Sequence, residues 1–404
     1  MNVSADSPSE GRLSQFLFAG WLLLWLSLQV SDLPVKLLLK NHFQLGAADI
    51  AIFGLVTGIA WYTKPLCGWL SDSVRFFGTR RRHYLLLSST LSGIVWCALA
   101  VLPLTYGILL GALILINAGK TLSNAVLGGI LVDTGHRFGT TGRLSSQRSA
   151  VTSAVTLISG PVAGFLAGKA FGWAALASAL CAFLLGAACY RFLPEAPTPR
   201  PEKRTGGSPN PLRELLRSRS LWWGLLMSFL FMLAPGFGTP LLFLQQDTLR
   251  FSPQLIGNLA LLNGAAGLVG ALVYGYLCHR VALRPLLVGG TLASVGAILC
   301  FLRYDTLPHA VLVTLATGFT GALATLPVAD LTARATPRGN EALGFSLMVS
   351  ASNVAWKFSD VLGSWLYQHK HFHFPQLVLL NAGTTLCMLL VLPLVPRSLT
   401  DKRL

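Results

Sequence analysis

Charged side chains occur inside several long apolar stretches of the chain, and they are the first candidates for chemistry. A charge in the middle of a lipid bilayer costs about 2.5–3.5 kcal/mol on insertion scales, so it tends to face a partner or a polar cavity. Spacing separates candidates that have an opposite charge one helical turn away from those that have none. The six residues are Asp32, Lys36, Lys64, Lys120, Lys357 and Asp360.

The lysines are candidates for binding an anion. Lys64 and Lys120 have no acid one turn away along the chain, which predicts either an anionic ligand or an acidic partner on another helix. Lys120 and Lys357 lie deepest in their apolar stretches, and we expect both to face a ligand cavity. For Lys357 the alternative is neutralisation by Asp360.

The acids Asp32 and Asp360 are candidates for carrying a proton. A carboxylate in a low-dielectric cavity holds a proton more readily than one in water. Asp32 has Lys36 one turn away and stands beside Pro34, so neutralisation near a helix end is the alternative for it.

Two tryptophans, Trp61 and Trp356, could stack a flat ligand, although packing or anchoring at the membrane interface is the commoner role of tryptophan.

The seven cysteines all lie in or beside apolar stretches without metal-ligand spacing, so they predict neither a disulfide framework nor a zinc site. The segment with His369, His371 and His373 contains no acid or cysteine. We therefore expect a solvated loop there, no metal site and no cofactor.

A glycine, an acid and a basic cluster follow one another in the segment G-W-L-S-D-S-V-R-F-F-G-T-R-R-R. Gly68 permits close helix approach, Asp72 can pair with a base, and Arg80 and Arg81 belong to the basic cluster. This predicts a gate that opens when two halves of the protein rock; a cluster that only fixes orientation in the membrane is the alternative. Asp133 and Arg137, one turn apart, are expected to form a second part of the gate or an ordinary helix-end pair.

Composition indicates what must position these residues. Hydrophobic residues make up 53% of the 404 and charged residues only 11%, whereas soluble domains carry about 25% charged residues. A membrane span needs about 20 apolar residues. Twelve helices are predicted, at 14–39, 47–71, 83–103, 105–134, 145–168, 172–193, 221–246, 253–279, 284–303, 308–333, 341–367 and 375–396.

A polar segment rich in proline divides the helices into two groups of six. The segment P-E-A-P-T-P-R-P-E-K-R-T-G-G-S-P-N-P is typical of a linker. We expect an N-terminal bundle over 1–193, a linker over 194–220 and a C-terminal bundle over 221–404.

Lysine and arginine outnumber aspartate and glutamate by 31 to 15. The excess lies in alternate short loops rather than on one stripe, which disfavours nucleic-acid binding. Cytoplasmic loops of membrane proteins carry the excess of basic residues. The pattern therefore predicts both termini in the cytoplasm and a multi-pass protein of the plasma membrane (the inner membrane if the source is bacterial). The basic residues of the predicted outer loops are Lys40, Lys169, Arg250, Arg303 and Lys370.

A weak internal repeat relates the two halves. The second predicted helix closes with G-W-L-S-D and the eighth with G-Y-L-C-H, while the fourth and tenth close with V-D and A-D. Parallel halves of six helices are typical of the major facilitator fold. The expected fold is therefore an all-α membrane protein with twelve transmembrane helices in two pseudo-symmetric six-helix bundles.

Two segments resemble the folate–biopterin transporter family. Y-T-K-P-L-C-G-W-L-S-D-S-V-R-F-F-G-T-R-R-R-H-Y-L is similar to that family's K-P-L-x-G-x-x-S-D-S…G-x-R-R-R-x-Y, and A-T-P-R-G-N-E-A-L-G-F-S-L-M-V-S-A-S-N to its C-P-x-G-x-E-A-x-x-F-x-L-x-x-S-x-x-N. The resemblance implies transport of folates or pterins. The matching positions are Lys64, Pro65, Asp72, Arg80, Arg81, Glu341 and Asn353.

The chain departs from that family's pattern in its fourth predicted helix. The family tends to carry two acids there, whereas this chain keeps Asp133 and has Lys120 and Asn124 upstream. Peptidoglycan-fragment permeases share a similar basic region and remain an alternative. We expect Lys120, Asn124, Asn353 and Lys357 to contribute to the substrate site.

These observations predict a monomeric secondary transporter that moves a small organic anion, a folate or pterin, by alternating access with proton coupling. A proton-driven exporter of amphiphilic compounds is the main alternative, because S-G-P-V-A-G-F-L-A-G in the fifth helix resembles a pattern of proton antiporters. A membrane receptor or scaffold is a third. An enzyme is disfavoured, since no nucleophile–base pair or phosphate loop stands at usable spacing.

Overall fold

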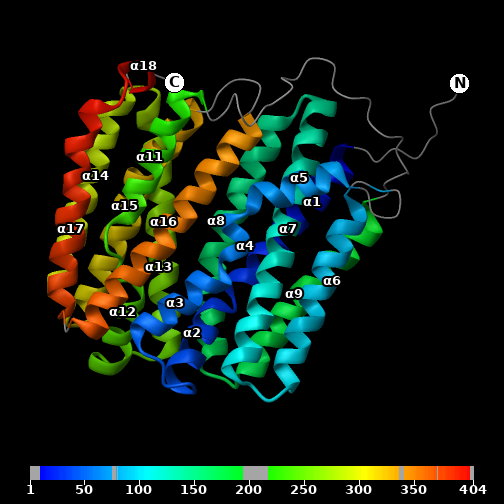
Figure 1. Ribbon diagram of the computed structural model, residues 1–404, viewed down its shortest axis with the longest axis horizontal. Coiled ribbons are helices and arrows are strands. Elements are labelled where there is room, and N and C mark those ends of the chain that lie inside the picture. The colour runs from blue at the N-terminus through cyan, green and yellow to red at the C-terminus, as the bar shows by residue number, and fades with distance from the viewer. Residues whose placement is uncertain are drawn as a thin grey trace, which may run out of the picture. The chain divides into compact units, whose positions relative to one another are not determined.

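Helices account for nearly all of the chain in the computed structural model, which describes residues 10–74, 79, 81–193, 217–335, 341–370 and 372–400. Figure 1 shows the helices along the chain. Within the described residues ten helices are long and apolar enough to cross a membrane. The other two predicted spans correspond to the broken segment α3–α5 and to the long helix α16. Only helices satisfy their own backbone hydrogen bonds in hydrocarbon, which is why the spans are helical.

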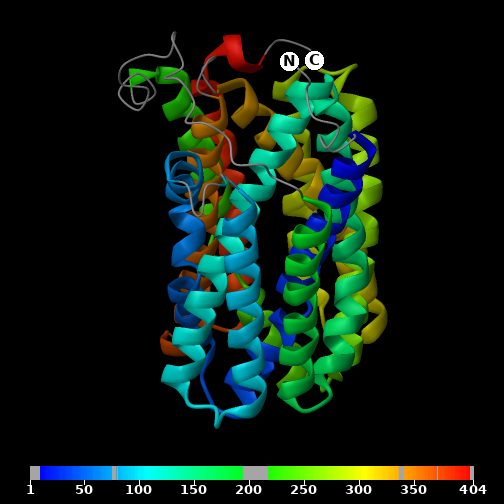
Figure 2. The same cartoon turned by 90° about the vertical axis from the view of Figure 1, so that its right-hand side faces the viewer.

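The chain forms two compact units, and the first consists of Met1–Leu38 and Thr57–Glu202. Its helices α1, α6, α7 and α9 lie side by side (Figure 2). Buried side chains of α1, including Phe16, Trp21 and Leu24, form the core together with Leu127 and Leu185. The helices are α1 (Glu10–Gln29), α2 (Asp32–Asn41), α4 (Ile59–Tyr62), α5 (Lys64–Ser73), α6 (Arg82–Val101), α7 (Tyr106–Phe138), α8 (Thr141–Ala167) and α9 (Phe171–Phe192).

The second unit consists of Leu39–Val56 and Lys203–Leu404. Three groups join the short segment Leu39–Val56 to the rest of this unit: Lys40 pairs with Asp247, and Gln368 accepts from the Ala48 backbone N–H and donates to Asp49. The helices are α3 (Ala47–Thr57), α11 (Arg219–Leu233), α12 (Gly238–Phe243), η1 (Leu244–Thr248), α13 (Pro253–Cys278), α14 (Leu283–Leu299), η2 (Cys300–Arg303), α15 (Leu307–Ala335), α16 (Glu341–His369), α17 (Phe374–Val391), η3 (Leu392–Leu394) and α18 (Arg397–Thr400).

Three of the predicted helices are interrupted, each beside a proline. Proline lacks the backbone N–H, and its ring clashes with the carbonyl four residues earlier. The first helix breaks at Val30–Ser31, before Pro34; the second breaks at Gly58 and Thr63, before Pro65; the seventh breaks after Leu233, at Pro235. The sequence ranges 14–39, 47–71 and 221–246 are therefore not continuous helices.

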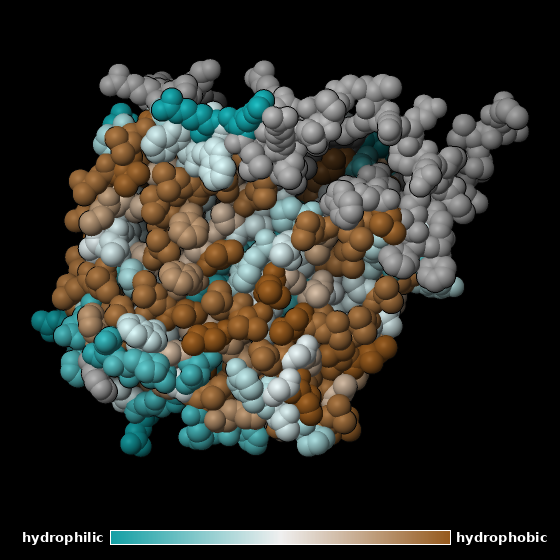
Figure 3. Space-filling view, in the orientation of Figure 1, coloured by the Kyte–Doolittle hydropathy of each residue, from teal (hydrophilic) through white to brown (hydrophobic). Residues whose placement is uncertain are grey.

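Large apolar side chains are exposed on the helices. Figure 3 shows hydrophobic side chains over most of the face in view, with hydrophilic ones toward its lower and upper edges. Large apolar side chains such as Leu272, Leu312 and Leu390 are at least 63% exposed. A soluble protein rarely exposes so much apolar surface, so these side chains fit contact with lipid.

Glycines on α13 and α14 of the second unit let the backbones of these helices lie directly against the backbone of α15. A Cβ on Gly290 of α14 would lie 2.2 Å from the Leu323 carbonyl oxygen of α15, and one on Gly270 of α13 would lie 2.4 Å from the Phe319 carbonyl oxygen. Small residues permit such close approach between membrane helices.

Gly290→Ala is expected to push α14 away from α15 and to lower the stability by about 1–3 kcal/mol, because the obstacle is backbone rather than a flexible side chain. The adjacent Gly289→Ala is the matched control, since nothing lies within 4 Å of its Cβ position. Thermal unfolding of both variants in detergent tests this packing. Equal midpoints for the two variants would contradict it.

Candidate functional site

An ion pair between Arg81 and Asp133 joins the start of α6 to the end of α7. The Arg81 Nη2 lies 2.9 Å from the Asp133 Oδ2, and the Arg81 side chain is only 8% exposed whereas that of Asp133 is 53% exposed. Gly129, one turn before Asp133, provides the space: a Cβ on it would lie 2.7 Å from the Arg81 Cζ. A buried arginine is stable only when its charge is compensated, so the pair fixes the loop before α6 against α7.

The other residues predicted to form the gate stand as follows. Gly68 is half-buried in α5, and nothing lies within 4 Å of its Cβ position. Asp72 belongs to the last turn of α5, but its side chain lies outside the described residues, as does all of Arg80. The Arg137 guanidinium lies over the Phe138 ring at 5.1 Å. The described ion pair of Asp133 is thus made with Arg81, across two elements.

The second unit has a related arrangement at the end of α15. Arg334 donates from Nε and Nη2 to the Asp330 carboxylate at 3.0 and 2.9 Å, and the Tyr274 hydroxyl of α13 donates to the same carboxylate at 3.4 Å. Asp330 occupies in its unit the place of Asp133, as the sequence repeat predicts. Here, however, the arginine comes from the same helix one turn later.

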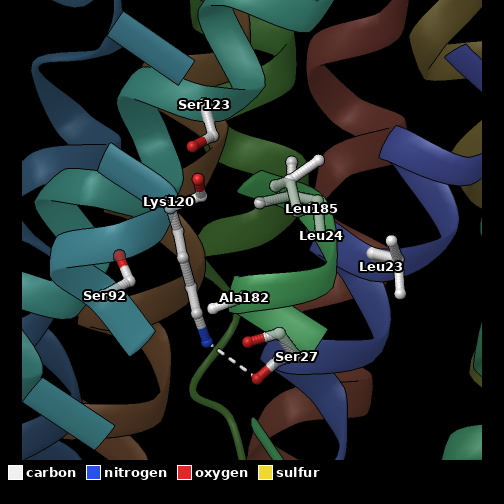
Figure 4. Close-up of a pocket in the computed structure, with 9 residues that line it drawn as sticks. Leu23, Leu24, Ser27, Ser92, Lys120, Ser123, Ala182 and Leu185 are labelled. Atoms are coloured by element: carbon white, nitrogen blue, oxygen red, sulfur yellow. Dashed lines mark hydrogen bonds between the residues drawn. The ribbon is translucent and has the colours of Figure 1, made fainter. Parts of the chain in front are cut away.

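Lys120 extends into the interior of the first unit (Figure 4). Its Nζ donates to the Ser27 carbonyl oxygen at 2.7 Å and lies 5.2 Å from the centroid of the Trp96 ring, and the residue is 4% exposed. A small cavity adjoins it, lined by Leu23, Leu24, Ser27, Ser89, Ser92, Ser123, Ala182 and Leu185. This cavity has room for about one water molecule, and Lys120 lies beside it inside the first unit.

Asn124 lies one turn after Lys120 on α7 and is 2% exposed. In the described part of the chain its Nδ2 is buried without a hydrogen-bond partner. The two residues therefore share one interior side of α7. The prediction that they contact the substrate is not tested by this placement.

The remaining predicted lysine of the first unit, Lys64, belongs to a group of cations and indole rings. Trp25 of α1 stacks with Trp61 of α4, with ring centroids 6.3 Å apart and an interplanar angle of 23°. The Trp61 Nε1 donates to the Asn117 Oδ1 at 3.3 Å, which fixes the ring. Lys64 begins α5, three residues after Trp61.

Arg148 of α8 lies beside this group. Its guanidinium lies 4.3 Å from the centroid of the buried Trp21 ring, and its positive charge interacts with that of Lys64. Arg148 is not among the site residues predicted from the sequence. Arg148 lies inside the predicted helix 145–168 as well as in α8, so its position within an apolar span was the signal that could have marked it as a candidate.

In the second unit, Lys357 and Trp356 are neighbours on α16. The Lys357 Nζ lies 4.9 Å from the Trp356 ring centroid and 3.4 Å from the Cβ position of Gly54. Trp356 is 58% exposed, which suits a membrane-facing ring better than a ligand-stacking one. Asn353 is half-buried on the same helix, one turn before Lys357.

The two predicted proton carriers have different surroundings. Asp360 accepts from the Thr239 backbone N–H at 3.1 Å and from the Thr239 hydroxyl at 2.7 Å, so it caps the start of α12. Asp32 pairs with the Lys36 Nζ at 2.7 Å, and its side chain is 62% exposed. Asp360 therefore caps α12, whereas Asp32 lies where water can reach it; proton coupling at either residue stays a prediction.

No group of three or more His, Cys, Asp or Glu side chains in the described residues is arranged to hold a metal ion. His371 lies outside those residues. What the site residues offer is charge and flat aromatic surface, which binds ligands rather than transforms them.

Gly129→Ala is expected to displace the Arg81 guanidinium from Asp133 and to lower the stability by about 1–3 kcal/mol. The neighbouring Gly128→Ala is the control, because nothing lies within 4 Å of its Cβ position. The thermal unfolding midpoint in detergent is measured for each variant, and the measurement is repeated with the Asp133→Asn substitution also present. If Gly129→Ala has the same effect with and without Asp133, the glycine does not act through the ion pair.

Comparison with solved structures shows which fold carries these residues. The nucleoside transporter NupG aligns with a TM-score of 0.77 at 11% identity, over 95% of this chain and 99% of the other. A D-xylose-proton symporter aligns with a TM-score of 0.69 at 17% identity, over 94% of this chain and 97% of the other. Similarity at this level shows the fold alone, and it confirms the predicted all-helical major facilitator fold.

Sequence comparison identifies the family. The BT1 family matches residues 26–402. The folate-biopterin transporter of Synechocystis sp. is 26% identical over 398 residues, 91% of this chain and 78% of that protein. Folate transporter 1 of Plasmodium falciparum is 24% identical over 405 residues, which cover 92% of this chain and 77% of that protein. The predicted family is confirmed, as is a transporter rather than an enzyme: this multi-pass integral membrane protein belongs to the BT1 family of folate–biopterin transporters.

Proposed function

We propose that this chain is a secondary carrier that moves a folate or pterin anion across the membrane by alternating access, coupled to protons. The observation that carries the proposal is the group of Trp25, Trp61, Lys64 and Arg148 on the first unit. Indole rings stack flat aromatic ligands, and cations attract carboxylates. A folate or pterin anion has both features, and the names of the two relatives agree with it.

The alternatives fit these side chains less well. An exporter of amphiphilic compounds was suggested by the glycine–proline pattern of α8, which continues as one helix through Pro161. Hydrophobic or cationic amphiphiles would not need two cations beside the indole rings. A permease for peptidoglycan fragments would need an anion site, but its sugar ligands lack the flat aromatic ring that the indole pair suits.

The proposed setting is the plasma membrane, with both termini in the cytoplasm and the protein acting as a monomer. The bias of lysine and arginine toward alternate loops supports this orientation. A fluorescent protein fused after Leu404 should therefore fluoresce, and alkaline phosphatase at the same place should be inactive. The opposite result would reverse the orientation.

The transport proposal predicts uptake of labelled folate by proteoliposomes that contain the purified protein. Uptake should exceed that of protein-free liposomes, should saturate, and should be competed by unlabelled folate. Export of unrelated hydrophobic dyes without any folate movement would favour the exporter instead. Movement of muropeptides alone would favour the permease.

Proton coupling predicts that an imposed pH gradient accelerates folate accumulation and that Asp32→Asn removes this acceleration. Counterflow exchange of folate at equal pH should persist in Asp32→Asn, because that exchange needs no net proton movement. The Asp360→Asn variant serves for comparison: loss of the α12 cap should lower the thermal midpoint while leaving the gradient dependence in the folded fraction. Unchanged gradient dependence in Asp32→Asn would exclude Asp32 as the proton carrier.

A further inference from the structure

Five side chains of the first unit, those of Trp21, Trp25, Trp61, Lys64 and Arg148, belong to one group of aromatic rings and cations. Arg148 lies on the Trp21 ring, Trp21 and Trp25 stand one turn apart on α1, and Trp25 stacks on Trp61. Trp61 and Lys64 are three residues apart, and the charge of Lys64 interacts with that of Arg148. α1, α4, α5 and α8 thus bring indole rings and two positive charges into one region of the first unit.

The two cations of this group have no acidic partner among the described residues. Lys36 and Arg81 each have a carboxylate within 2.9 Å, whereas the described residues give neither Lys64 nor Arg148 a salt bridge. Both are half-buried, so water screens their mutual repulsion only in part. Two like charges held together in this way are destabilised unless an anion lies between them.

The positions of the rings limit what that anion can be. Trp61 stacks on Trp25 and precedes Lys64 by three residues, so this ring pair is the flat aromatic surface next to Lys64 in the chain. Arginine presents a planar fork that binds a carboxylate through two parallel hydrogen bonds, and lysine adds a point charge. A carboxylate attached to a flat ring system can satisfy the cations and the rings together.

We propose that Lys64 and Arg148 bind a carboxylate of the substrate, so that this chain selects carboxylated pterins, folates among them, over uncharged pterins. The proposal rests on the proposed function only in taking pterins as the substrate class. It transfers the anion site from Lys120, which lies against the Ser27 carbonyl inside the bundle, to the Lys64–Arg148 pair.

Binding to the purified protein in detergent tests the subsite independently of transport. The probes are pterin, pterin-6-carboxylate and folate, measured by isothermal titration calorimetry. Pterin and pterin-6-carboxylate differ by the one group that the two cations are expected to hold. The wild-type protein should bind pterin-6-carboxylate at least about tenfold more tightly than pterin, since one charge-assisted contact contributes that much. Equal affinities would overturn the proposal.

Charge-removing variants locate the effect. Lys64→Gln and Arg148→Gln should each lower the affinity for pterin-6-carboxylate and for folate by about tenfold. The affinity for pterin should change by less than about twofold, and Arg148→Lys should keep part of the preference for the carboxylate. Lys169→Gln is the matched control, because Lys169 follows the same helix α8 at its other end, over the Phe165 ring. Equal losses for all three probes would show a structural role and overturn the proposal, as would an unchanged preference for the carboxylate.

The outcome separates this inference from the proposed function. If the wild-type protein prefers the carboxylated pterin but does not carry folate into proteoliposomes, the subsite is supported and the transport proposal is contradicted. If folate is carried with unchanged kinetics by the Lys64→Gln and Arg148→Gln variants, transport is supported and the subsite is contradicted.

Discussion

A charged group among apolar helices must be compensated, and this constraint explains most of the polar architecture. In the first unit Asp133 compensates the buried Arg81, and in the second Asp330 compensates Arg334 while Asp247 pairs with Lys40. Desolvation makes each unpaired charge costly, so the pairs are strong constraints on which helices can be neighbours. Where two cations stand together without an acid in the described chain, as Lys64 and Arg148 do, the compensation has to come from elsewhere.

The same constraint applies to backbone groups, because a helix break in hydrocarbon frees carbonyls and N–H groups that need partners. At the break between α1 and α2, the Ser27 carbonyl accepts from the Lys120 ammonium and from the Ser31 hydroxyl. At the break after α11, Asp360 receives the N–H and the hydroxyl of Thr239 at the start of α12. Lys120 and Asp360 thus stabilise kinks within their own units, and this local role accounts for two charges that would otherwise suggest a ligand.

Glycine supplies the space that charge compensation requires. Gly129 leaves room for the Arg81 guanidinium, because a Cβ there would lie 2.7 Å from the Arg81 Cζ. The arginine thus crosses α7 where that helix has no side chain. Close packing and electrostatics are therefore coupled: the ion pair of Arg81 depends on a residue that carries no charge.

The sequence alone determined the fold class, the membrane setting and the family, because apolar stretches of helical length and two specific motifs depend only on local residue order. It also indicated six charged residues within the apolar stretches, although it missed Arg148. Tertiary structure decided the partners. Asp133 pairs with Arg81 at the start of another helix, Lys120 points into the bundle interior, and the charge of Arg148 interacts with that of Lys64 although the two are far apart in the chain. Helical periodicity shows which residues share a face, but only the packing of helices determines which face of another helix lies opposite.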